Sequence, residues 1–455
     1  MSDAQGPIPD DGSEDELRKL LRELLSGQGG FDPAKLAGVA GLPNDPAAVQ
    51  ALLSQLQAAV ANPGNGLDWQ VARDQARRVA QPGNREISHE EAARFDQAFR
   101  VAQLWLSEAT ELGEISESPA TLTRLEWITG SIQFWTSLSE PVATSIADAL
   151  MNVLTEQTPP EMAQLLGQSS SMMRGIGGAM FAVQLGQVVG NLAEEVVAGG
   201  DIGVPVLDHS RPSLLPQNID DFAEGLDVDR EQIELYLAVR ETAHARLFQH
   251  AKWLRLHLIS SITEFARGVS IDVSRMEELA QTLDPSDPDG IRAALSEGAF
   301  IPPRTEQQEA ALARLETMLA LIEGWVDVVT EDATSRLPKS VALAETVRRR
   351  RAVGGPAERA FASLVGLELR PRRLREAAAM WRAVSEAHGA KVRDELWAHF
   401  DALPTTEDID HPEALVTRLG FGELPADEYD EALAKFLDDP SAFGDAPEGG
   451  DKPVN

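Results

Sequence analysis

The residues best suited to chemistry in this sequence lie in one short stretch, which reads Arg240-Glu241-Thr242-Ala243-His244. Positions four residues apart face the same side of a helix, so two histidines at that spacing can bind one zinc ion through their imidazoles. A glutamate directly after the first histidine can act as the general base toward a zinc-bound water. Glu241 and His244 stand at the positions of that base and of the second ligand, whereas Arg240 stands where the first imidazole is needed.

Arg240 cannot take the part of a histidine ligand. A guanidinium has five hydrogen-bond donors and no acceptor, and it stays protonated in proteins. It therefore offers no lone pair to a metal and also places a positive charge where the metal would lie. Because a catalytic zinc ion normally has three protein ligands and a water, the sequence predicts weak or absent zinc binding at this stretch.

Two histidines farther along the chain are alternative ligands. His250 follows His244 by six residues, and nothing between them breaks a helix. Six residues of helix turn through about 600°, which leaves the two side chains about 120° apart. His257 is the other alternative, so an active zinc site with an unusual ligand set stays open.

An acidic pair downstream supplies a candidate for a further ligand. Glu323 and Asp327 are one helical turn apart within the apolar run 319–327. One carboxylate in such a pair can bind a metal, and the other can orient a histidine ligand. Acidic pairs at this spacing also occur on solvated helices, but the apolar surroundings here favour a buried site.

Several short segments, taken in their order and spacing, resemble the zincin-like metallopeptidases related to proteins linked to deazaflavin-cofactor biosynthesis. The resemblance runs from about Phe95 to Leu419 and rests on the segments 184–190, 241–244, 323–327, 366–370 and 403–405. It implies a mainly helical zincin fold with Glu241 as general base, His244 and Glu323 as zinc ligands, and Asp327 as the residue that supports a ligand. Arg240 is the point at which this sequence departs from the family pattern.

The resemblance also gives Arg240 a partner. Glu323 would lie beside His244 in a partly buried cleft, where an unpaired carboxylate costs on the order of several kcal/mol. A guanidinium fits a carboxylate well, and its charge is permanent. We therefore predict an Arg240–Glu323 ion pair in place of the metal, with His244 adjacent and Asp327 within reach. The alternative is that Arg240 points to solvent or pairs with Glu241.

Composition excludes several classes of function. The chain has 455 residues, a formal net charge of −33 and no cysteine. So acidic a protein repels nucleic acid and anionic membranes, and we expect neither nucleic-acid binding nor membrane insertion. The lack of cysteine excludes disulfides and thiolate zinc sites. The first residues lack the basic and apolar regions of a signal peptide, so a cytoplasmic location is expected.

Long segments with apolar residues at helical spacing predict a mainly α, multi-helical fold with at most a small sheet. We expect a disordered acidic N-terminus at 1–15 and an N-terminal helical segment at 16–64. A zincin-like helical domain should follow at 65–437, and a disordered acidic tail at 438–455.

Three further segments carry expectations about structure. Residues 172–192 are apolar and rich in glycine, which predicts a buried helix hairpin with close backbone contacts. Residues 202–207 predict an edge strand or an extended loop that forms one wall of the cleft. The arginine run 348–351 favours internal ion pairs over an anion site, because the chain as a whole is so acidic.

Three functions are compatible with the sequence. The first is a degenerate zincin that has lost zinc and binds a protein or peptide partner through the former cleft. The second is an active zinc-dependent hydrolase completed by His250 or His257. The third is a helical interaction protein unrelated to zincins, in which residues 240–244 are an ordinary helix surface. The identity of the partner and the oligomeric state cannot be read from the sequence.

Overall fold

The structure is a computed structural model of the whole chain. It describes residues 69–156, 178, 181–207, 211–267, 304–352, 356–367, 369 and 372–421. The predicted boundaries near residues 15, 64 and 437 lie outside these ranges, as do the two termini predicted to be disordered. They therefore stay predictions.

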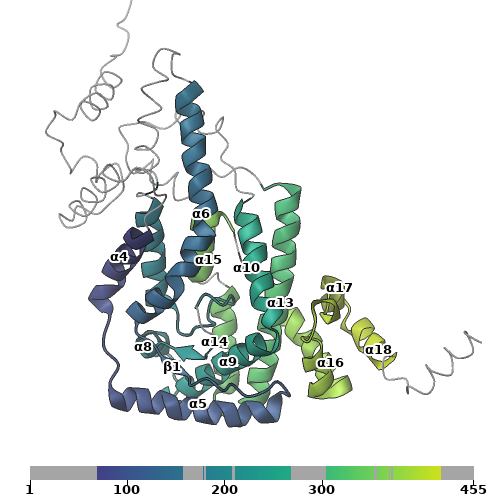
Figure 1. Cartoon of the computed structure of the whole chain (residues 1–455). Coiled ribbons are helices and arrows are strands. Elements are labelled where there is room, and N and C mark those ends of the chain that lie inside the picture. The colour runs from purple at the N-terminus through teal and green to yellow at the C-terminus, as the bar shows by residue number, and fades with distance from the viewer. Residues whose placement is uncertain are drawn as a thin grey trace, which may run out of the picture. The chain divides into compact units, whose positions relative to one another are not determined.

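The described chain is mainly helical, as predicted, and its strands are very short (Figure 1). The elements, in chain order, are α4 (Trp69–Ala80), η1 (Gln81–Gly83), α5 (His89–Ala109), β1 (Ala120–Thr121), α6 (Arg124–Glu156), an unlabelled helix at 181–195, β2 (Ser213–Leu214), α8 (Pro216–Ala223), α9 (Arg230–His250), α10 (Lys252–Arg267), α13 (Glu306–Ala333), α14 (Ser340–Ala352), α15 (Pro356–Val365), α16 (Leu374–Glu395), η2 (Phe400–Ala402), α17 (Thr406–Asp410) and α18 (Pro412–Phe421).

The chain divides into two compact units. The first comprises residues 1–71, 143–184 and 271–302, and the second comprises 72–142, 185–270 and 303–455. All the residues discussed below belong to the second unit. It contains both strands and the helices that position the candidate site.

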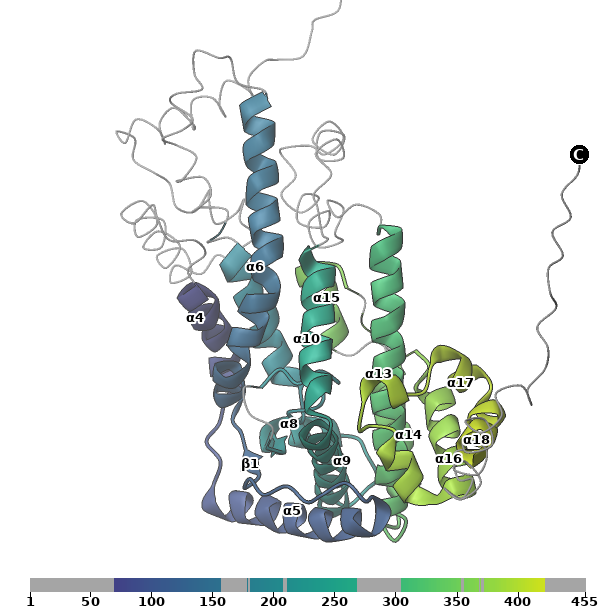
Figure 2. The same cartoon turned by 45° about the vertical axis from the view of Figure 1, so that its right-hand side comes forward.

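Helix α9 is the centre of the second unit. From Ile233 to Leu247 almost every one of its residues is buried, including several that are charged. It packs against α5, which lies at the base of Figures 1 and 2. It also contacts α13, α14, α10 and β2. A helix buried on all sides is usually apolar, so the charged residues of α9 must find partners within the protein. Arg246 does so by donating to the main-chain oxygen of Gln103 on α5 at 2.8 Å.

Helix α13 packs most extensively against α16. It begins at a capping box, in which Thr305 and Gln308 satisfy each other's backbone N–H groups. Gly324 lies where the two helices come closest, because a Cβ atom at this position would stand 2.8 Å from the backbone nitrogen of Ala378. The glycine therefore permits the contact, while its neighbour Glu323 faces the candidate site.

Tryptophan side chains form much of the core. Five of them are fully buried: Trp127, Trp135, Trp325, Trp381 and Trp397. Trp381 stacks on Trp397 with 5.5 Å between ring centroids, and Trp325 donates to Asp394 at 2.9 Å. These contacts fasten α16 to α13 beneath the site.

The sheet consists of two parallel strands, with Ala120 opposite Ser213 and Thr121 opposite Leu214. Strand β2 contacts α9, so a strand does pass beside the central helix. The segment expected as an edge strand or an extended loop, residues 202–207, forms turns and bends and no strand. The loop alternative is therefore the one observed.

The helix at 181–195 packs against α4 through its glycines. A Cβ atom on Gly186 would stand 2.4 Å from the carbonyl oxygen of Ala72, and one on Gly190 would stand 2.6 Å from the Cβ of Val79. The predicted close backbone approach is confirmed. The first half of the predicted hairpin, before residue 178, lies outside the described residues.

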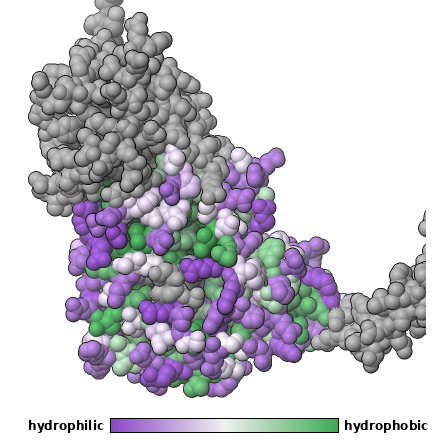
Figure 3. All heavy atoms as spheres, in the orientation of Figure 1, coloured by the Kyte–Doolittle hydropathy of each residue, from purple (hydrophilic) through white to green (hydrophobic). Residues whose placement is uncertain are grey.

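Polar and charged residues cover most of the face shown in Figure 3, with small hydrophobic areas between them. In the described part of the chain, no helix is long and apolar enough to cross a membrane.

The contact at Gly186 gives a first testable prediction. Gly186→Ala should lower the free energy of unfolding by about 1–3 kcal/mol, because the added methyl group overlaps the backbone of α4. Gly113→Ala is the matched control, since a Cβ there would meet nothing within 4 Å. Urea denaturation of both variants tests this. Equal midpoints for the two variants would contradict the close packing of these helices.

Candidate functional site

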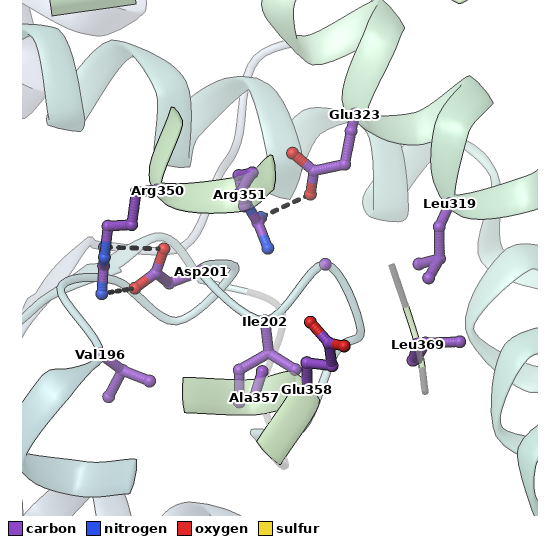
Figure 4. A pocket seen from close by; sticks show the side chains of 11 residues that line it. Val196, Asp201, Ile202, Leu319, Glu323, Arg350, Arg351, Ala357, Glu358 and Leu369 are labelled. Atoms are coloured by element: carbon purple, nitrogen blue, oxygen red, sulfur yellow. Dashed lines mark hydrogen bonds and ion pairs between the residues drawn. The ribbon is translucent and has the colours of Figure 1, made fainter. Parts of the chain in front are cut away.

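Three helices and one loop meet at the candidate site. Helix α9 supplies Arg240, Glu241 and His244 from its buried middle, and α13 supplies Glu323. Arg351 comes from the last turn of α14. The glycine-containing loop that follows the helix at 181–195 closes the site. Figure 4 shows Arg351 extending toward Glu323 at the edge of a cavity of about 30 Å³.

Glu323 is the common partner of two arginines. Its side chain is only 1% exposed. The Nη2 of Arg240 donates to one carboxylate oxygen, and the Nη2 of Arg351 donates to the other at 2.5 Å. The predicted Arg240–Glu323 ion pair is therefore confirmed, and the alternative of a solvent-directed Arg240 is wrong. The second arginine was not predicted from the sequence.

Burial and charge act in opposite directions on these arginines. Burial is the largest influence on Arg240 and works to lower its pKa. The combined attraction of Glu323, Asp327 and Asp201, together with Tyr236, outweighs burial, and the pKa is raised. For Arg351, burial prevails over the attraction of Glu323 and lowers the pKa. An arginine starts from so high a pKa that both groups remain charged near neutral pH. Glu323 is thus held between two permanent positive charges.

His244 lies next to this cluster, as predicted. Its Nε2 is 3.6 Å from the nearer oxygen of Glu323, beyond hydrogen-bonding distance. Among the residues that the structure describes, neither ring nitrogen has a hydrogen-bond partner, although the side chain is buried. Burial, together with the charges of Arg240 and Arg351, lowers the pKa of His244 well below its ordinary value. The imidazole is therefore neutral and has a free lone pair.

Asp327 binds an arginine. It lies one turn after Glu323 on α13 and accepts a hydrogen bond from Arg348 at 2.6 Å. Asp327 is buried on α13, as expected of a carboxylate that orients a neighbouring side chain. The side chain that it binds, however, is Arg348 on α14.

All four arginines at 348–351 form ion pairs within the chain, as predicted, although the pair of Arg349 lies on the surface. Arg348 binds Asp327, Arg349 binds Glu345, Arg350 binds Asp201 and Arg351 binds Glu323. Figure 4 shows the pair of Arg350 and Asp201 beside the cavity. Helix α14 is thereby held to α13 and to the loop over α9.

Both oxygens of Glu241 accept hydrogen bonds from the backbone. Oε2 accepts from the N–H of Gly200 at 2.9 Å, and Oε1 accepts from the N–H of Ser213 at 3.0 Å. The loop can come this close because positions 199 and 200 are glycines: a Cβ on either would stand 2.9 Å from an oxygen of Glu241. Glu241 thus ties the loop and β2 to α9, which no feature of the sequence had indicated.

A larger cavity opens on the other side of His244. Its volume is about 320 Å³. Glu241, His244 and Phe248 on α9 form its floor, and Lys252 and Arg255 at the start of α10 form one side. Pro205 and Leu207 from the loop line it too, so the expectation that residues 202–207 form one wall of the cleft is confirmed.

The family model for zincin-like metallopeptidases matches residues 67–416 of this chain. The chain belongs to the zincin-like metallopeptidase family. A crystal structure of a candidate hydrolase with a novel fold, from Chloroflexus aurantiacus, aligns with a TM-score of 0.53 and 19% identity, over 78% of this chain and 99% of that chain. At that identity the likeness shows a shared fold. The comparison with curated proteins found no match.

Neither comparison mentions deazaflavin biosynthesis, so that link stays a prediction.

The residues of this zincin-like site do not fit a zinc ion. Arg240 offers no lone pair to a metal, and the carboxylate of Glu323 is already engaged by two guanidinium groups. His250 lies at the exposed end of α9, and His257 packs against the aromatic rings of Trp253 and Phe400. Within the described residues, no three histidine or acidic side chains are placed to hold a metal together.

Glu323 should contribute more to the free energy of unfolding than either of the two arginines that bind it in this zincin-like site. Glu323→Gln leaves two buried guanidinium groups without a counter-charge and should cost about 3–5 kcal/mol of unfolding free energy. Arg240→Ala and Arg351→Ala should each cost less, about 1–3 kcal/mol, because the other arginine still binds Glu323. Urea denaturation measures all three. Arg349→Ala is the control: its partner is on the surface, so it should change little. A Glu323→Gln variant as stable as wild type would contradict the cluster.

Glu241 should make stability depend on pH. Burial raises its pKa to about 8, although the two backbone N–H groups act to lower it. An unfolded glutamate has a pKa of about 4.3. Between these values the folded state keeps a proton that the unfolded state has released, so rising pH lowers the free energy of unfolding.

Glu241→Gln should remove this contribution. The difference in unfolding free energy, wild type minus variant, should therefore fall between about pH 5 and about pH 8. Urea denaturation of both proteins across this range measures it. A difference that stays constant with pH would mean that Glu241 is ionised throughout.

Proposed function

We propose that this chain is a zincin-like protein without a catalytic metal, which uses the former active-site cleft to bind a segment of a protein or peptide partner. Its acidic, cysteine-free composition supports a cytoplasmic role for such a protein. The partner is not a nucleic acid, because the strongly negative chain would repel it.

The observation that carries this proposal is the pair of arginines on Glu323. Arg240 occupies the position of the first ligand, and Arg351 takes the carboxylate oxygen that Arg240 does not. A zinc ion would have to displace both guanidinium groups and would still find only His244 and Glu323 as ligands. The cavity beside His244 remains, so the cleft keeps room for a ligand.

Zinc content of engineered variants tests the proposal. The wild-type protein should contain far less than one zinc per chain by elemental analysis. From the sequence alone, Arg240→His would be expected to restore zinc binding, but Arg351 would still bind Glu323. The single variant should therefore stay zinc-poor, whereas Arg240→His combined with Arg351→Gln should take up about one zinc, having two imidazoles and a carboxylate.

Arg351→Gln alone is the control for the second substitution, and it should take up no zinc. About one zinc per chain in the wild-type protein would overturn the proposal. So would peptide hydrolysis by the wild-type protein that a chelator stops and that Glu241→Gln abolishes, because Glu241 would then be acting as a general base.

A further inference from the structure

The cavity beside His244 is lined by more positive than negative side chains, in a chain whose net charge is −33. Arg211, Lys252 and Arg255 are the cations, and Glu117 and Glu241 are the acids. Both oxygens of Glu241 already accept hydrogen bonds from backbone N–H groups. A concave site with an excess of one sign of charge attracts ligands of the opposite sign. The described lining residues carry three cations and two acids, whereas acids outnumber cations in the chain as a whole.

Polar atoms around this cavity also lack partners. Four buried atoms make no hydrogen bond to the described part of the chain: the Nε of Arg211, the Oε1 of Gln249 and both ring nitrogens of His244. His244 is more than nine-tenths buried. Buried polar groups in proteins nearly always have partners, whether protein, water or ligand, so these atoms are available to a ligand that enters the cavity.

The remaining walls decide the shape of that ligand. Ile115, Pro205, Leu207 and Phe248 add apolar surface to the cavity. Arg255 donates through Nη2 to the carbonyl oxygen of Leu207 at 2.8 Å. This hydrogen bond holds the guanidinium in place and uses only one of its donor groups. The volume of about 320 Å³ lies at the lower end of the range for small-ligand sites.

We propose that this cavity binds an oxyanionic group, a carboxylate or a phosphate, that is attached to an apolar body. The oxyanion contacts Arg211, Lys252 and Arg255, and the apolar body lies against Phe248 and the loop. This inference rests on the proposed function, in that it assigns a ligand class to the same metal-free cleft. On a partner peptide, the matching group is the C-terminal carboxylate after an apolar residue.

Matched pairs of probes separate charge from shape. The first pair is N-acetyl-leucyl-phenylalanine with a free carboxylate and the same dipeptide as a carboxamide. The second is phenyl phosphate and phenol. Isothermal titration of the full-length protein should show binding of at least one charged probe and at least tenfold weaker binding of its neutral counterpart. The pair that binds identifies the oxyanion, and binding should weaken as salt is added.

Substitutions then place the binding at this cavity. Arg211→Gln and Lys252→Gln should each weaken the charged probe about five- to tenfold. Lys391→Gln is the matched control: Lys391 is an exposed cation on α16 that pairs only loosely with Glu395, at 3.8 Å, and it should change binding less than twofold. Thermal unfolding of each variant confirms that it is folded.

Two results would overturn the inference: no binding of either charged probe, or equal binding by wild type, Arg211→Gln and Lys252→Gln. Neither depends on the zinc measurements. A zinc-free protein that binds no oxyanion would contradict this inference and leave the proposed function intact. A zinc-containing protein would overturn the proposed function whatever the probes do.

Discussion

One buried carboxylate, that of Glu323, holds the candidate site together. It comes from α13, and its two oxygens receive donors from α9 and from the last turn of α14. Each charge is buried and would be costly alone, since removing one partner of a buried pair exposes the other to an apolar environment. The arrangement is thus mutually dependent: Arg240 and Arg351 are tolerated inside the protein because Glu323 is there, and Glu323 is tolerated because of them.

Glu241 ties down the other side of the site through backbone contacts. Its two oxygens receive the N–H groups of Gly200 and Ser213, so the loop and β2 lie flat against α9. Glu241 thus has a structural role, and the cavity of about 320 Å³ lies beside it and His244.

The sequence predicted much of the helical frame and part of the site. The 3.6-residue spacing of apolar side chains indicated the long helices, and an unpaired buried carboxylate at Glu323 required a cation, which Arg240 could supply. Arg351 was missed because it lies in a run of four arginines, where the sequence gives no sign of which one reaches Glu323. The position of the strand was also missed: β2 depends on hydrogen bonds from residues far apart in the chain, which local propensity does not encode.

The charges of the cluster explain why two arginines stand at this site. A zinc ion carries two positive charges, and a site made of neutral histidines and one glutamate adds one negative charge. Arg240 and Arg351 together also carry two positive charges, Glu323 carries one negative charge and His244 is neutral. In this structure Arg240 donates to one oxygen of Glu323 and Arg351 donates to the other, so the two arginines share the carboxylate. Once they are present, replacing Glu323 with an apolar residue would leave two guanidinium groups unpaired in the core. Glu323 is therefore held in the interior by the arginines, and a buried glutamate of this kind does not by itself indicate a bound metal.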